Sequence, residues 1–402
     1  MTRRCAPSER TEVCVVGAGP AGLLLANVLA ARGVGCIVLE RQTRAQALSR
    51  ARAGLTASSA VAILERHGLA EGLLARGVPH DSIEFRSAGQ GSVLNYAELG
   101  ECGPHYVYPQ QELVADLVRA FEERGGDLRF GVGAQAVTDD GMPLVDCTGR
   151  LSIRSELVAG CDGSHSIVAR AIPPHRRGVR RSSHAAAWLA VLAQAPPSTE
   201  RIIYATHARG FAGHMLRTPE ISRYYLEIAV EDTTEDWPDD RVWRELRTRL
   251  AKPDWTLTDG PIIAKDRVAL DSIICEPMQH GRIYLAGDSA HLLTPAAARG
   301  MNLAVADGDA LAEGMVAFLR EHDAALLDGY TERRMPDVLE AQSFSDLLLD
   351  VVEEAGPGRG LVGFAPRLAA ALGLVSVASH DTRRFARRYG GEHPAAELAM
   401  PR

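Results

Sequence analysis

The order of apolar and polar positions along the chain predicts alternating strands and helices in its first third. Residues 12–17 (EVCVVG) form a continuous apolar run that ends at a glycine, which is typical of a buried parallel strand. A helical segment follows and closes at Gly33, and residues 36–40 (CIVLE) predict a second strand. Residues 111–125 have the spacing of an amphipathic helix. The chain therefore opens with one predicted βαβ unit.

The middle of the chain follows a different pattern. Residues 183–232 alternate and are rich in β-forming side chains, which predicts an antiparallel sheet and hence a second domain. A helix is expected at 239–250. Two short apolar runs, 155–161 and 281–286, are expected to return to the first sheet. Beyond these runs the pattern is mostly helical, with breaks expected at Pro336, 356–363 and Pro366.

Composition narrows the class of protein. The chain has 402 residues, 46% of them hydrophobic and 24% charged, and a net charge of -7. No broad basic surface for nucleic acid is expected at that charge. No run of 18 apolar residues is present, so no membrane span is expected. The seven cysteines contain no CxxC pair, which argues against a zinc site or a disulfide framework. A reducing, cytoplasmic location fits, and the polar first eleven residues predict a disordered tail rather than a signal peptide.

One glycine motif carries binding chemistry. Gly17, Gly19 and Gly22 form GxGxxG between the predicted strand and helix. The first makes a tight turn, the second lets the backbone approach a pyrophosphate, and the third permits close packing of helix and strand. Glu40 ends the second strand, where an acid binds a ribose hydroxyl pair. The motif indicates a dinucleotide and does not distinguish FAD from NAD.

A second motif favours FAD. Residues 285–291 (LAGDSAH) follow a predicted strand and precede a helix, and Asp288 lies where an acid can bind the ribitol of a flavin. The helix after Pro295 would aim its positive end at the flavin pyrimidine. A third segment, containing Asp162 and His165, is a turn by itself, but its position between the two motifs favours a place at the cofactor edge. The histidines show no metal-ligand spacing, so no metal is expected, and no GxSxG is present.

These motifs together resemble the single-component FAD-dependent aromatic hydroxylases. The chain is identified as a member of the p-hydroxybenzoate hydroxylase family on further blocks, from about residue 12 to 390. The blocks are LERQT at 39–43, RARAG at 50–54, IYATHARGFA at 203–212, SRYY at 222–225, EPMQHGR at 276–282 and GMNLA at 300–304.

The resemblance implies contacts with two cofactors. The residues expected to contact FAD are Gly17, Gly19, Gly22, Glu40, Arg50, Arg52, Gln110, Asp162, Asp288 and Asn302. Those expected to help receive NADPH are His165, Arg41 and Gln42. Because only one Rossmann unit is evident, NADPH or NADH would bind transiently at a surface cleft, with O2 as the other co-substrate. The choice between the two nucleotides stays open.

The resemblance also implies a place for the substrate. Arg217 would pair with a carboxylate, since a guanidinium fork suits that group, and Tyr225 would donate to it. The carbonyl of Pro295 would face a phenol. The proton path would consist of Tyr204, Tyr389 and His80, which would end it at solvent. Taken alone, the two tyrosines of the β-rich stretch would be packing residues, Arg217 a surface arginine and His80 a loop histidine.

The pocket departs from the family pattern at four positions. Met215 stands where the family usually has a serine that helps hold the carboxylate, and Ala296 stands in place of a threonine. Asp271 replaces an arginine that helps bind NADPH, and Gln46 replaces a tyrosine near the nucleotide. The retained proton path with an altered wall favours the same reaction on a modified substrate.

The expected fold is α/β (α+β), a Rossmann-like FAD-binding domain with an inserted antiparallel β-sheet substrate domain and a helical C-terminal region. The expected divisions are 1–182 for the FAD-binding domain with its tail at 1–11, 183–275 for the substrate domain, 276–345 for a second FAD-binding segment with a flavin-facing helix, and 346–402 for the C-terminal region.

The expected reaction is hydroxylation of a 4-hydroxybenzoate-type phenolic acid, ortho to an electron-donating group, through a flavin C4a-hydroperoxide. A ring-substituted acid, for example an amino-hydroxybenzoate, stays open, and the small aromatic acid would be the partner of a homodimer. A WxWxIP segment would favour a halogenase, and the sequence contains none. A flavin reductase or sensor is the other rival, and the joint presence of Tyr204, Arg217, Tyr225 and Tyr389 argues against a protein without turnover.

Overall fold

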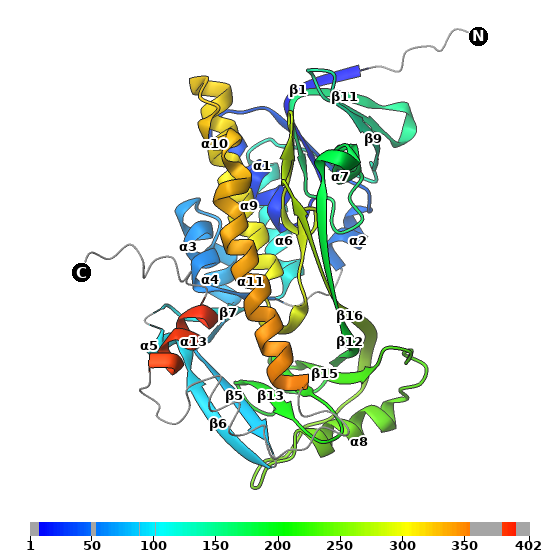
Figure 1. Cartoon of the computed structure of the whole chain (residues 1–402), viewed down its shortest axis with the longest axis vertical. Coiled ribbons are helices and arrows are strands. Elements are labelled where there is room, and N and C mark those ends of the chain that lie inside the picture. The colour runs from blue at the N-terminus through cyan, green and yellow to red at the C-terminus, as the bar shows by residue number, and fades with distance from the viewer. Residues whose placement is uncertain (1–7, 50–53, 88, 101, 354–379, 391–402) are drawn as a thin grey trace.

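The computed structural model describes residues 8–49, 54–87, 89–100, 102–353 and 380–390, and it shows an elongated molecule with two sheet-containing regions (Figure 1). Arg50 and Arg52, and the helix breaks expected at 356–363 and Pro366, lie outside these residues. A long helix, α11, runs beside both regions (Figure 1).

The first sheet is built on parallel strands in the order β17-β18-β11-β1-β2-β8, with β10 and β9 added beside β11. The pairs β1–β11, β1–β2, β2–β8 and β11–β18 are parallel. The mixed α/β architecture predicted from the sequence is therefore confirmed. The strands are β1 (Ser8–Val16), β2 (Cys36–Glu40), β8 (Asp127–Phe130), β9 (Ala134–Thr138), β10 (Leu144–Cys147), β11 (Ser152–Gly160), β17 (Gln279–His280) and β18 (Ile283–Leu285).

The predicted tail over residues 1–11 is too long. Strand β1 begins at Ser8, and its residues up to Thr11 pair in register with Ser152 to Ser155 of β11. Polar side chains in this segment gave no apolar signal, but backbone pairing with a neighbouring strand needs none. Strand β1 therefore extends beyond the buried run that the sequence indicates.

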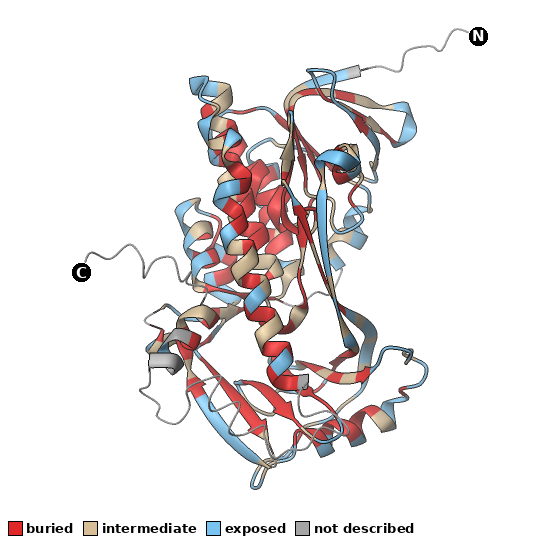
Figure 2. Ribbon diagram, in the orientation of Figure 1, coloured by how far each residue is buried: buried red, intermediate tan, exposed pale blue. Residues whose placement is uncertain are grey.

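Helix α1 (Pro20–Ala31) lies at the centre of the first region. Its residues from Pro20 to Leu29 are all buried, because the helix is apolar on every side. It packs against α9 (Gly300–Val316) and α6 (Gln110–Glu123), and this core appears as the red centre of Figure 2. The smaller helices are α2 (Arg44–Ser49), α3 (Ser58–Arg66), α4 (Glu71–Arg76), α7 (Ile167–Ala171) and α10 (Ala325–Asp328).

The second sheet has the order β19-β16-β12-β15-β14-β13-β5-β6. Helix α8 (Asp239–Arg249) packs on one face, where Trp243 contacts Tyr224 edge-on. Strands β12 and β16 pair over most of their length and join the two regions (Figure 1). The strands are β5 (Ser82–Ser87), β6 (Gln90–Asn95), β12 (Gly178–Ala193), β13 (Ile202–Thr206), β14 (Ala212–Thr218), β15 (Ile221–Ala229), β16 (Ile262–Glu276) and β19 (His291–Leu292).

This sheet reaches beyond the predicted boundaries at 183 and 275. It takes β5 and β6 from the first hundred residues, and β13 pairs in parallel with β5. A division at residue 182 thus separates strands that share one sheet. A small third sheet consists of β3 (Leu55–Thr56), β7 (His105–Val107) and β4 (Val78–His80), which lie between β2 and β8 in the sequence.

The break predicted at Pro336 is wrong, because helix α11 (Tyr330–Glu353) continues through that proline. Packing on both sides of Pro336 holds the helix: Arg334 pairs with the buried Asp307, and Val338 is fully buried. Such tertiary contacts offset the hydrogen bond that proline removes. Helix α5 (Tyr96–Leu99) packs against the last described helix, α13 (His380–Gly390).

Candidate active site

The turn between β1 and α1 is shaped for a phosphate-bearing ligand. Gly17 has a φ of 109°, and a Cβ there would lie 2.2 Å from the carbonyl oxygen of Cys161. A Cβ on Gly22 would lie 2.1 Å from the carbonyl oxygen of Gly17. Gly19 begins α1 without a side-chain cap, and nothing lies within 4 Å of a Cβ at that position. The open helix N-terminus thus presents free N–H groups to an anion.

Glu40 is fixed at the end of β2, beside this turn. Its carboxylate accepts the N–H of Ala18 at 3.0 Å and the N–H of Gln42 at 2.9 Å. The three predicted glycine positions and Glu40 are therefore brought together as the βαβ pattern requires. A cavity of about 400 Å³ opens here, and among the predicted residues Gly17, Gly19, Glu40, Arg41, Gln42, Gln110, Asp162 and His165 line it.

The loop that carries Asp288 is held by a buried charge network. Asp307 accepts the N–H of Gly287 at 2.9 Å, lies 2.6 Å from Nε2 of His291, and receives Nε of Arg334 at 2.8 Å. Although burial opposes ionisation, the neighbouring His291 and Arg334 hold the pKa of Asp307 well below its usual range. The network fixes the loop, while Asp288 itself lines the adjoining cavities.

Three of the cavities adjoin one another and share lining residues. A small cavity shares Gly19 and Gln110 with the cavity at Glu40. It shares Gln110 and Asp288 with a larger one of about 690 Å³ on the substrate-sheet side. A row of cavities that starts at an open helix N-terminus and ends in a larger chamber suits the phosphates and ring of FAD.

Two predicted cofactor residues have their polar atoms engaged by the protein. The carboxylate of Asp162 accepts the N–H of Ile167 at 2.7 Å and the hydroxyl of Ser166 at 2.5 Å. It therefore caps α7, and burial raises its pKa. Asn302 accepts the N–H of Ala57 and donates to the carbonyls of Leu55 and Ala298, so it ties β3 to the start of α9.

The larger cavity is enclosed by the substrate sheet and by the segment at Pro295. Met215 on β14, Tyr225 on β15 and Tyr204 on β13 line it, together with Pro295 and Ala296. The Tyr204 hydroxyl donates to the carbonyl of Ala296 at 2.9 Å. The Pro295 carbonyl, which was expected to face a phenol, accepts the N–H of Ala298. The structure thus gathers five of the predicted substrate-site residues around one chamber.

A pair of buried tyrosines adjoins this cavity. The hydroxyls of Tyr204 and Tyr389 are hydrogen-bonded, and the two residues are 7% and 3% exposed. Burial raises the pKa of both, while Arg299 favours the ionised form of each. The two predicted proton-path tyrosines are thereby adjacent, although their helix and strand are far apart in sequence.

The expectation that His80 lies at solvent is wrong, and its place at the end of the proton path stays a prediction. His80 is 3% exposed, and burial lowers its pKa to about 4. Its Nε2 accepts the N–H of Ile202 at 3.1 Å, and its Nδ1 lies 3.0 Å from the hydroxyl of Tyr96. The imidazole is buried where β4 pairs with β7 and β5 pairs with β13. The amino-acid sequence does not show which short strands pair with each other.

Arg217 is buried on β14 and donates to Gln111 Oε1 at 2.8 Å, but it does not line the cavity. Burial, together with the nearby Arg223, lowers its pKa to about 10. Arg223 on β15 does line the cavity, and sequence reasoning missed it. Its only signal was its spacing from Tyr225, which places both side chains on one face of the strand. Among the described residues, neither arginine has a carboxylate within ion-pair distance.

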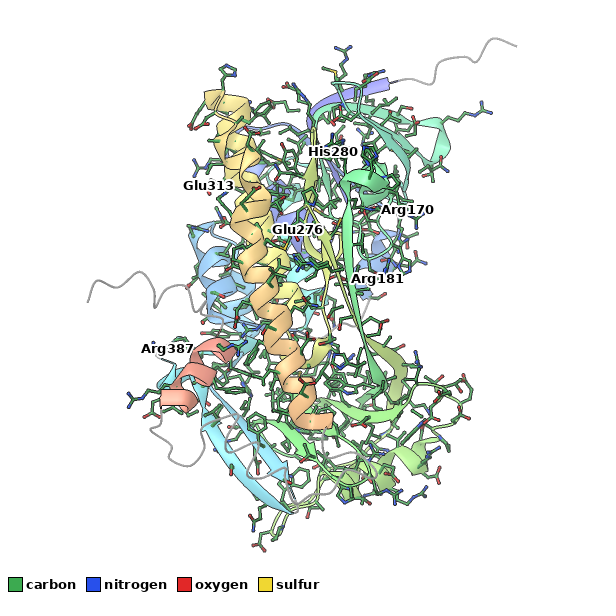
Figure 3. All side chains as sticks on the ribbon, in the orientation of Figure 1. Arg170, Arg181, Glu276, His280, Glu313 and Arg387 are labelled. Atoms are coloured by element: carbon green, nitrogen blue, oxygen red, sulfur yellow. The ribbon has the colours of Figure 1, made fainter. Side chains whose placement is uncertain are left out.

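A second cleft lies beside His165. Arg170, Arg177 and Arg181 line it, with Asp271 among them. Figure 3 labels Arg170 on α7 and Arg181 on β12. Asp288 also lines this cleft, so the cleft adjoins the same loop. Gln46 accepts the N–H of Thr43 and so closes the first turn of α2.

The described residues contain neither a metal-binding cluster nor a membrane-spanning helix. No group of three or more His, Cys, Asp or Glu side chains is placed to hold a metal ion in this part of the chain. None of the helices in the same ranges combines the length and the apolar character needed to cross a membrane.

Comparison with known proteins agrees with this geometry. Residues 10–345 match the FAD binding domain family. The p-hydroxybenzoate hydroxylase of Acinetobacter baylyi is 33% identical over 341 residues, covering 84% of each chain. The 3-amino-4-hydroxybenzoate 2-monooxygenase PtmB3 of Streptomyces platensis is 29% identical over 351 residues, covering 83% of this chain and 86% of the relative.

A solved structure shares the fold. The p-nitrophenol 4-monooxygenase PnpA of Pseudomonas putida superimposes with a TM-score of 0.81 at 21% identity, covering 95% of this chain and 97% of that one. With FAD, NAD(P)H and O2 as its cofactor and co-substrates, this chain is an aromatic monooxygenase. It belongs to the p-hydroxybenzoate hydroxylase family of FAD-dependent aromatic hydroxylases.

Proposed function

We propose that the chain hydroxylates a 4-hydroxybenzoate-type phenolic acid next to its hydroxyl group. The observation that carries the proposal is the pair of buried guanidiniums, Arg217 and Arg223, on the two strands that form the cavity wall. A buried charge is costly unless it is paired, so these two cations, which have no carboxylate within ion-pair distance among the described residues, favour an anionic ligand. At the other side of the cavity lie the hydroxyls of Tyr204 and Tyr389, which suit a phenol.

Each end of such a substrate meets residues of matching chemistry. Arg223 reaches the carboxylate from the cavity wall, and Arg217 joins it by exchanging Gln111 for the ligand. Tyr225 donates to the same carboxylate. The phenol gives its proton to Tyr204, whose hydroxyl passes one on to Tyr389. Removing this proton makes the ring electron-rich, which is what attack on an electrophilic oxygen requires.

Bound FAD supplies hydride acceptance from NAD(P)H and activation of O2. Gly17, Gly19 and Glu40 would hold its adenosine and pyrophosphate end, and Gln110 with Asp288 its ribitol. The walls of the larger cavity orient the substrate and exclude water, which limits loss of the activated oxygen as hydrogen peroxide. Asp271 among the arginines of the second cleft leaves NADH and NADPH both as candidates there.

A ring-substituted acid is the second candidate, and the cavity wall favours it. Met215 and Ala296 both line the cavity, so two of the four departures from the family pattern lie in the wall that would face the substrate. A thioether is only a weak acceptor, and alanine leaves more room than threonine. The relationship to a 3-amino-4-hydroxybenzoate 2-monooxygenase points to an amino group as the substituent.

Tyr204→Phe tests the proposed chemistry. The variant keeps the ring and loses the hydroxyl that would take the phenol proton, so flavin reduction by NAD(P)H should survive while hydroxylation falls about 100-fold, within the usual range for acid–base groups. Hydrogen peroxide should account for most of the nucleotide consumed. The assay is nucleotide oxidation, peroxide yield and product mass with 4-hydroxybenzoate and 3-amino-4-hydroxybenzoate. A wild type that neither acid stimulates would refute the proposal.

A further inference from the structure

One hydrogen bond joins the substrate sheet to the cofactor-binding region. Nη2 of Arg217, on β14, donates to Oε1 of Gln111, in the first turn of α6, at 2.8 Å. Arg217 is 6% exposed, and its guanidinium has no other hydrogen bond or ion pair within the described part of the chain. The amide oxygen of Gln111 therefore occupies a buried cation that suits a carboxylate.

The backbone of β14 explains why Arg217 reaches α6. The register between β14 and β15 shifts between Leu216 and Thr218, so Arg217 is the extra residue of a β-bulge. A bulge re-aims the side chain that it carries. Met215, two residues earlier, lines the larger cavity, whereas Arg217 contacts Gln111 and does not line it. The guanidinium is thus held beside the substrate cavity rather than in it.

Gln111 also lines the cavity at Glu40, which is the proposed site of the adenosine and pyrophosphate of FAD. The preceding residue, Gln110, lines this cavity, the small one beside it and the larger one. Gln111 therefore lies between the two ligand sites: its amide oxygen binds the arginine of the proposed carboxylate site, and the residue borders the dinucleotide cavity.

The start of α6 is fixed, so an exchange of partners requires movement of the Gln111 side chain alone. The N–H of Tyr108 donates to the carbonyl of Gly54 at 2.7 Å, and the Tyr108 hydroxyl donates to Asp116 at 2.6 Å. Gln111 itself is half-buried, and its amide nitrogen has no hydrogen-bond partner among the residues that the structure describes.

A carboxylate is a better partner for Arg217 than an amide. The guanidinium fork can donate two parallel N–H bonds to a carboxylate, which also neutralises the buried charge, whereas the Gln111 oxygen accepts one bond and is neutral. The positive charge of the nearby Arg223 adds to the attraction for an anion. The displaced amide of Gln111 then offers two N–H donors and an acceptor oxygen to polar groups in the dinucleotide cavity.

We propose that Gln111 is a positioning residue that couples the substrate to FAD: it holds Arg217 until the substrate carboxylate displaces its amide, which then binds the dinucleotide. The inference rests on the phenolic-acid hydroxylation proposed above, because it requires a substrate with a carboxylate. One hydrogen bond is exchanged for another, and no covalent bond changes. Because both ligands use Gln111, the substrate should raise the affinity for FAD, and FAD the affinity for the substrate, by the same factor.

Three variants of the holoenzyme test the competition for Arg217, with 4-hydroxybenzoate as the ligand and flavin fluorescence as the signal. Gln111→Leu removes the competing oxygen and should bind the acid about fivefold more tightly, less than a full hydrogen bond to a charged group because wild-type Gln111 regains a partner. Gln111→Glu adds a carboxylate that pairs with Arg217 and should bind the acid about tenfold more weakly. The control is Glu112→Leu, an exposed change on the same helical turn, which should stay within about twofold of the wild type.

The coupling is measured as release of FAD from the diluted holoenzyme, with and without saturating 4-hydroxybenzoate. In the wild type and in Glu112→Leu, the acid should tighten FAD binding by a factor about fivefold larger than in Gln111→Leu. A glutamine that served only to stabilise α6 would change the affinity for FAD without changing this ratio.

Each outcome decides one part of the inference. A Gln111→Leu enzyme that binds the acid no more tightly than the wild type overturns the competition, as does a Gln111→Glu enzyme with wild-type affinity, which remains informative if Gln111→Leu fails to fold. Equal effects of the acid on FAD binding in Gln111→Leu and the wild type overturn the coupling. In all three cases a wild type that hydroxylates the acid leaves the proposed function intact. A wild type that binds neither 4-hydroxybenzoate nor 3-amino-4-hydroxybenzoate refutes the proposed function and this inference with it.

Discussion

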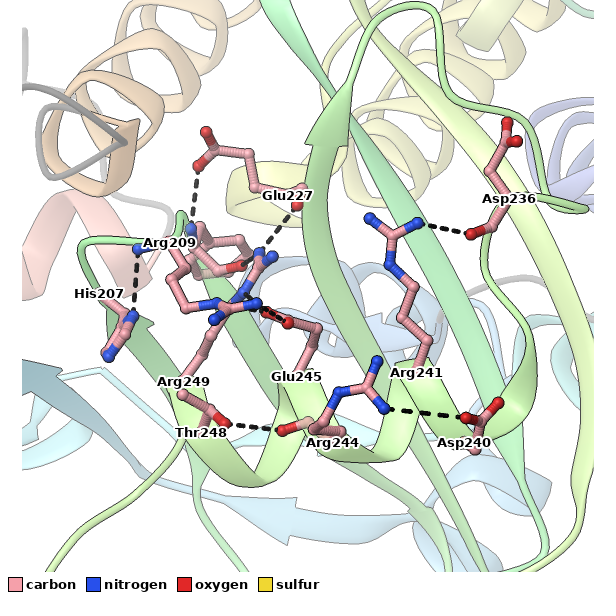
Figure 4. Close-up of polar contacts among 11 residues, drawn as sticks. His207, Arg209, Glu227, Asp236, Asp240, Arg241, Arg244, Glu245, Thr248 and Arg249 are labelled. Atoms are coloured by element: carbon pink, nitrogen blue, oxygen red, sulfur yellow. Dashed lines mark hydrogen bonds and ion pairs between the residues drawn. The ribbon is translucent and has the colours of Figure 1, made fainter.

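Buried arginines on the two faces of the substrate sheet are in opposite situations. On the face covered by α8, Arg249 donates to Glu245 at 3.1 Å and to the carbonyls of Phe211 and Glu227, and Arg209 pairs with the same Glu245 (Figure 4). On the cavity face, Arg217 and Arg223 are as buried as Arg249. Neither has a carboxylate partner among the described residues.

The difference distinguishes arginines that stabilise the fold through a carboxylate partner from arginines that are available to bind an anionic ligand. A buried cation paired with an acid changes the free energy of unfolding little, whereas removal of the acid lowers it strongly. A buried cation without an acid is already a cost, which a bound anion repays. The unpaired arginines of the cavity face are therefore expected to lower the stability of the ligand-free protein and to strengthen the binding of an anionic ligand. Four changes test that expectation.

Glu245→Ala should have the largest effect on the fold. It leaves Arg249 buried and uncompensated, as Arg217 is, and removing one partner of a buried pair costs about 3–5 kcal/mol. Urea unfolding followed by circular dichroism measures the change. Asp240→Ala, which removes a 3.8 Å exposed pair with Arg244 on the same helix, is the control and should cost less than about 1 kcal/mol. Equal losses in both variants would show that Glu245 stabilises only as a helix surface residue.

Arg217→Ala should do the reverse. The free energy of unfolding should stay unchanged or rise, since the variant removes a buried cation that has no acid partner. Binding of 4-hydroxybenzoate should weaken by roughly 2–5 kcal/mol, the range for losing one partner of a buried charge pair in a complex. A flavin-fluorescence titration gives the dissociation constant, and urea unfolding gives the stability. A destabilised variant with unchanged affinity would place Arg217 with the structural arginines.

Lowering the pH should destabilise the fold through two buried neutral histidines. Burial lowers the pKa of His214, on β14, and of His80 to about 4, from 6.5 in the unfolded chain. Below pH 6.5 the unfolded chain takes up protons that the folded chain does not. The free energy of unfolding therefore falls as the pH falls from 6.5 toward 4, and the full contribution of the neutral histidines is present above pH 6.5. The expected loss between pH 7 and 5 is about 2 kcal/mol for each histidine.

His214→Gln isolates one of these terms. If the histidine pKa is lowered by burial, urea unfolding of the variant should show about half of the wild-type loss between pH 7 and 5. An unchanged pH dependence would mean that His214 is charged in the folded protein or that carboxylates cause the loss.

The smallest expected change concerns the cavity wall itself. Met215→Ser combined with Ala296→Thr adds a donor for the carboxylate and narrows the cavity, so preference should shift toward unsubstituted 4-hydroxybenzoate. A hydrogen bond to a charged group contributes about 1.5–3 kcal/mol, which corresponds to roughly tenfold or more in relative kcat/KM. The comparison of kcat/KM for 4-hydroxybenzoate and 3-amino-4-hydroxybenzoate in both enzymes decides it. A wild type that already prefers the unsubstituted acid, with no shift in the variant, would exclude the substituted substrate.

Local patterns in the sequence predicted the first region well. Gly17, Gly19, Gly22 and Glu40 lie within one βαβ unit, where spacing along the chain fixes spacing in the fold. Helix α8 was likewise expected at 239–250 and is found at Asp239–Arg249. Such features depend on neighbours in the chain, which a single sequence contains.

Features that depend on contacts between residues far apart in the chain could not be predicted from the sequence. Tyr96 lies in a polar segment with no signal for burial, and only the packing of α5 on α13 places it beside Tyr389. His80 was predicted at solvent because nothing in the sequence shows that Ile202 covers its Nε2. Arg223 gave a weak signal, its spacing from Tyr225, that becomes informative only once the cavity face of β15 is known.

The parallel pair β5–β13 has a consequence for how the protein is made. The hairpin β5–β6 leaves the ribosome well over a hundred residues before Ile202–Thr206, its partner strand. A two-stranded hairpin is marginal by itself, and its open edge is a site for pairing with other chains. A fragment ending near residue 182 should therefore aggregate rather than fold as a free FAD-binding domain, whereas co-expression with the remaining chain should recover soluble protein.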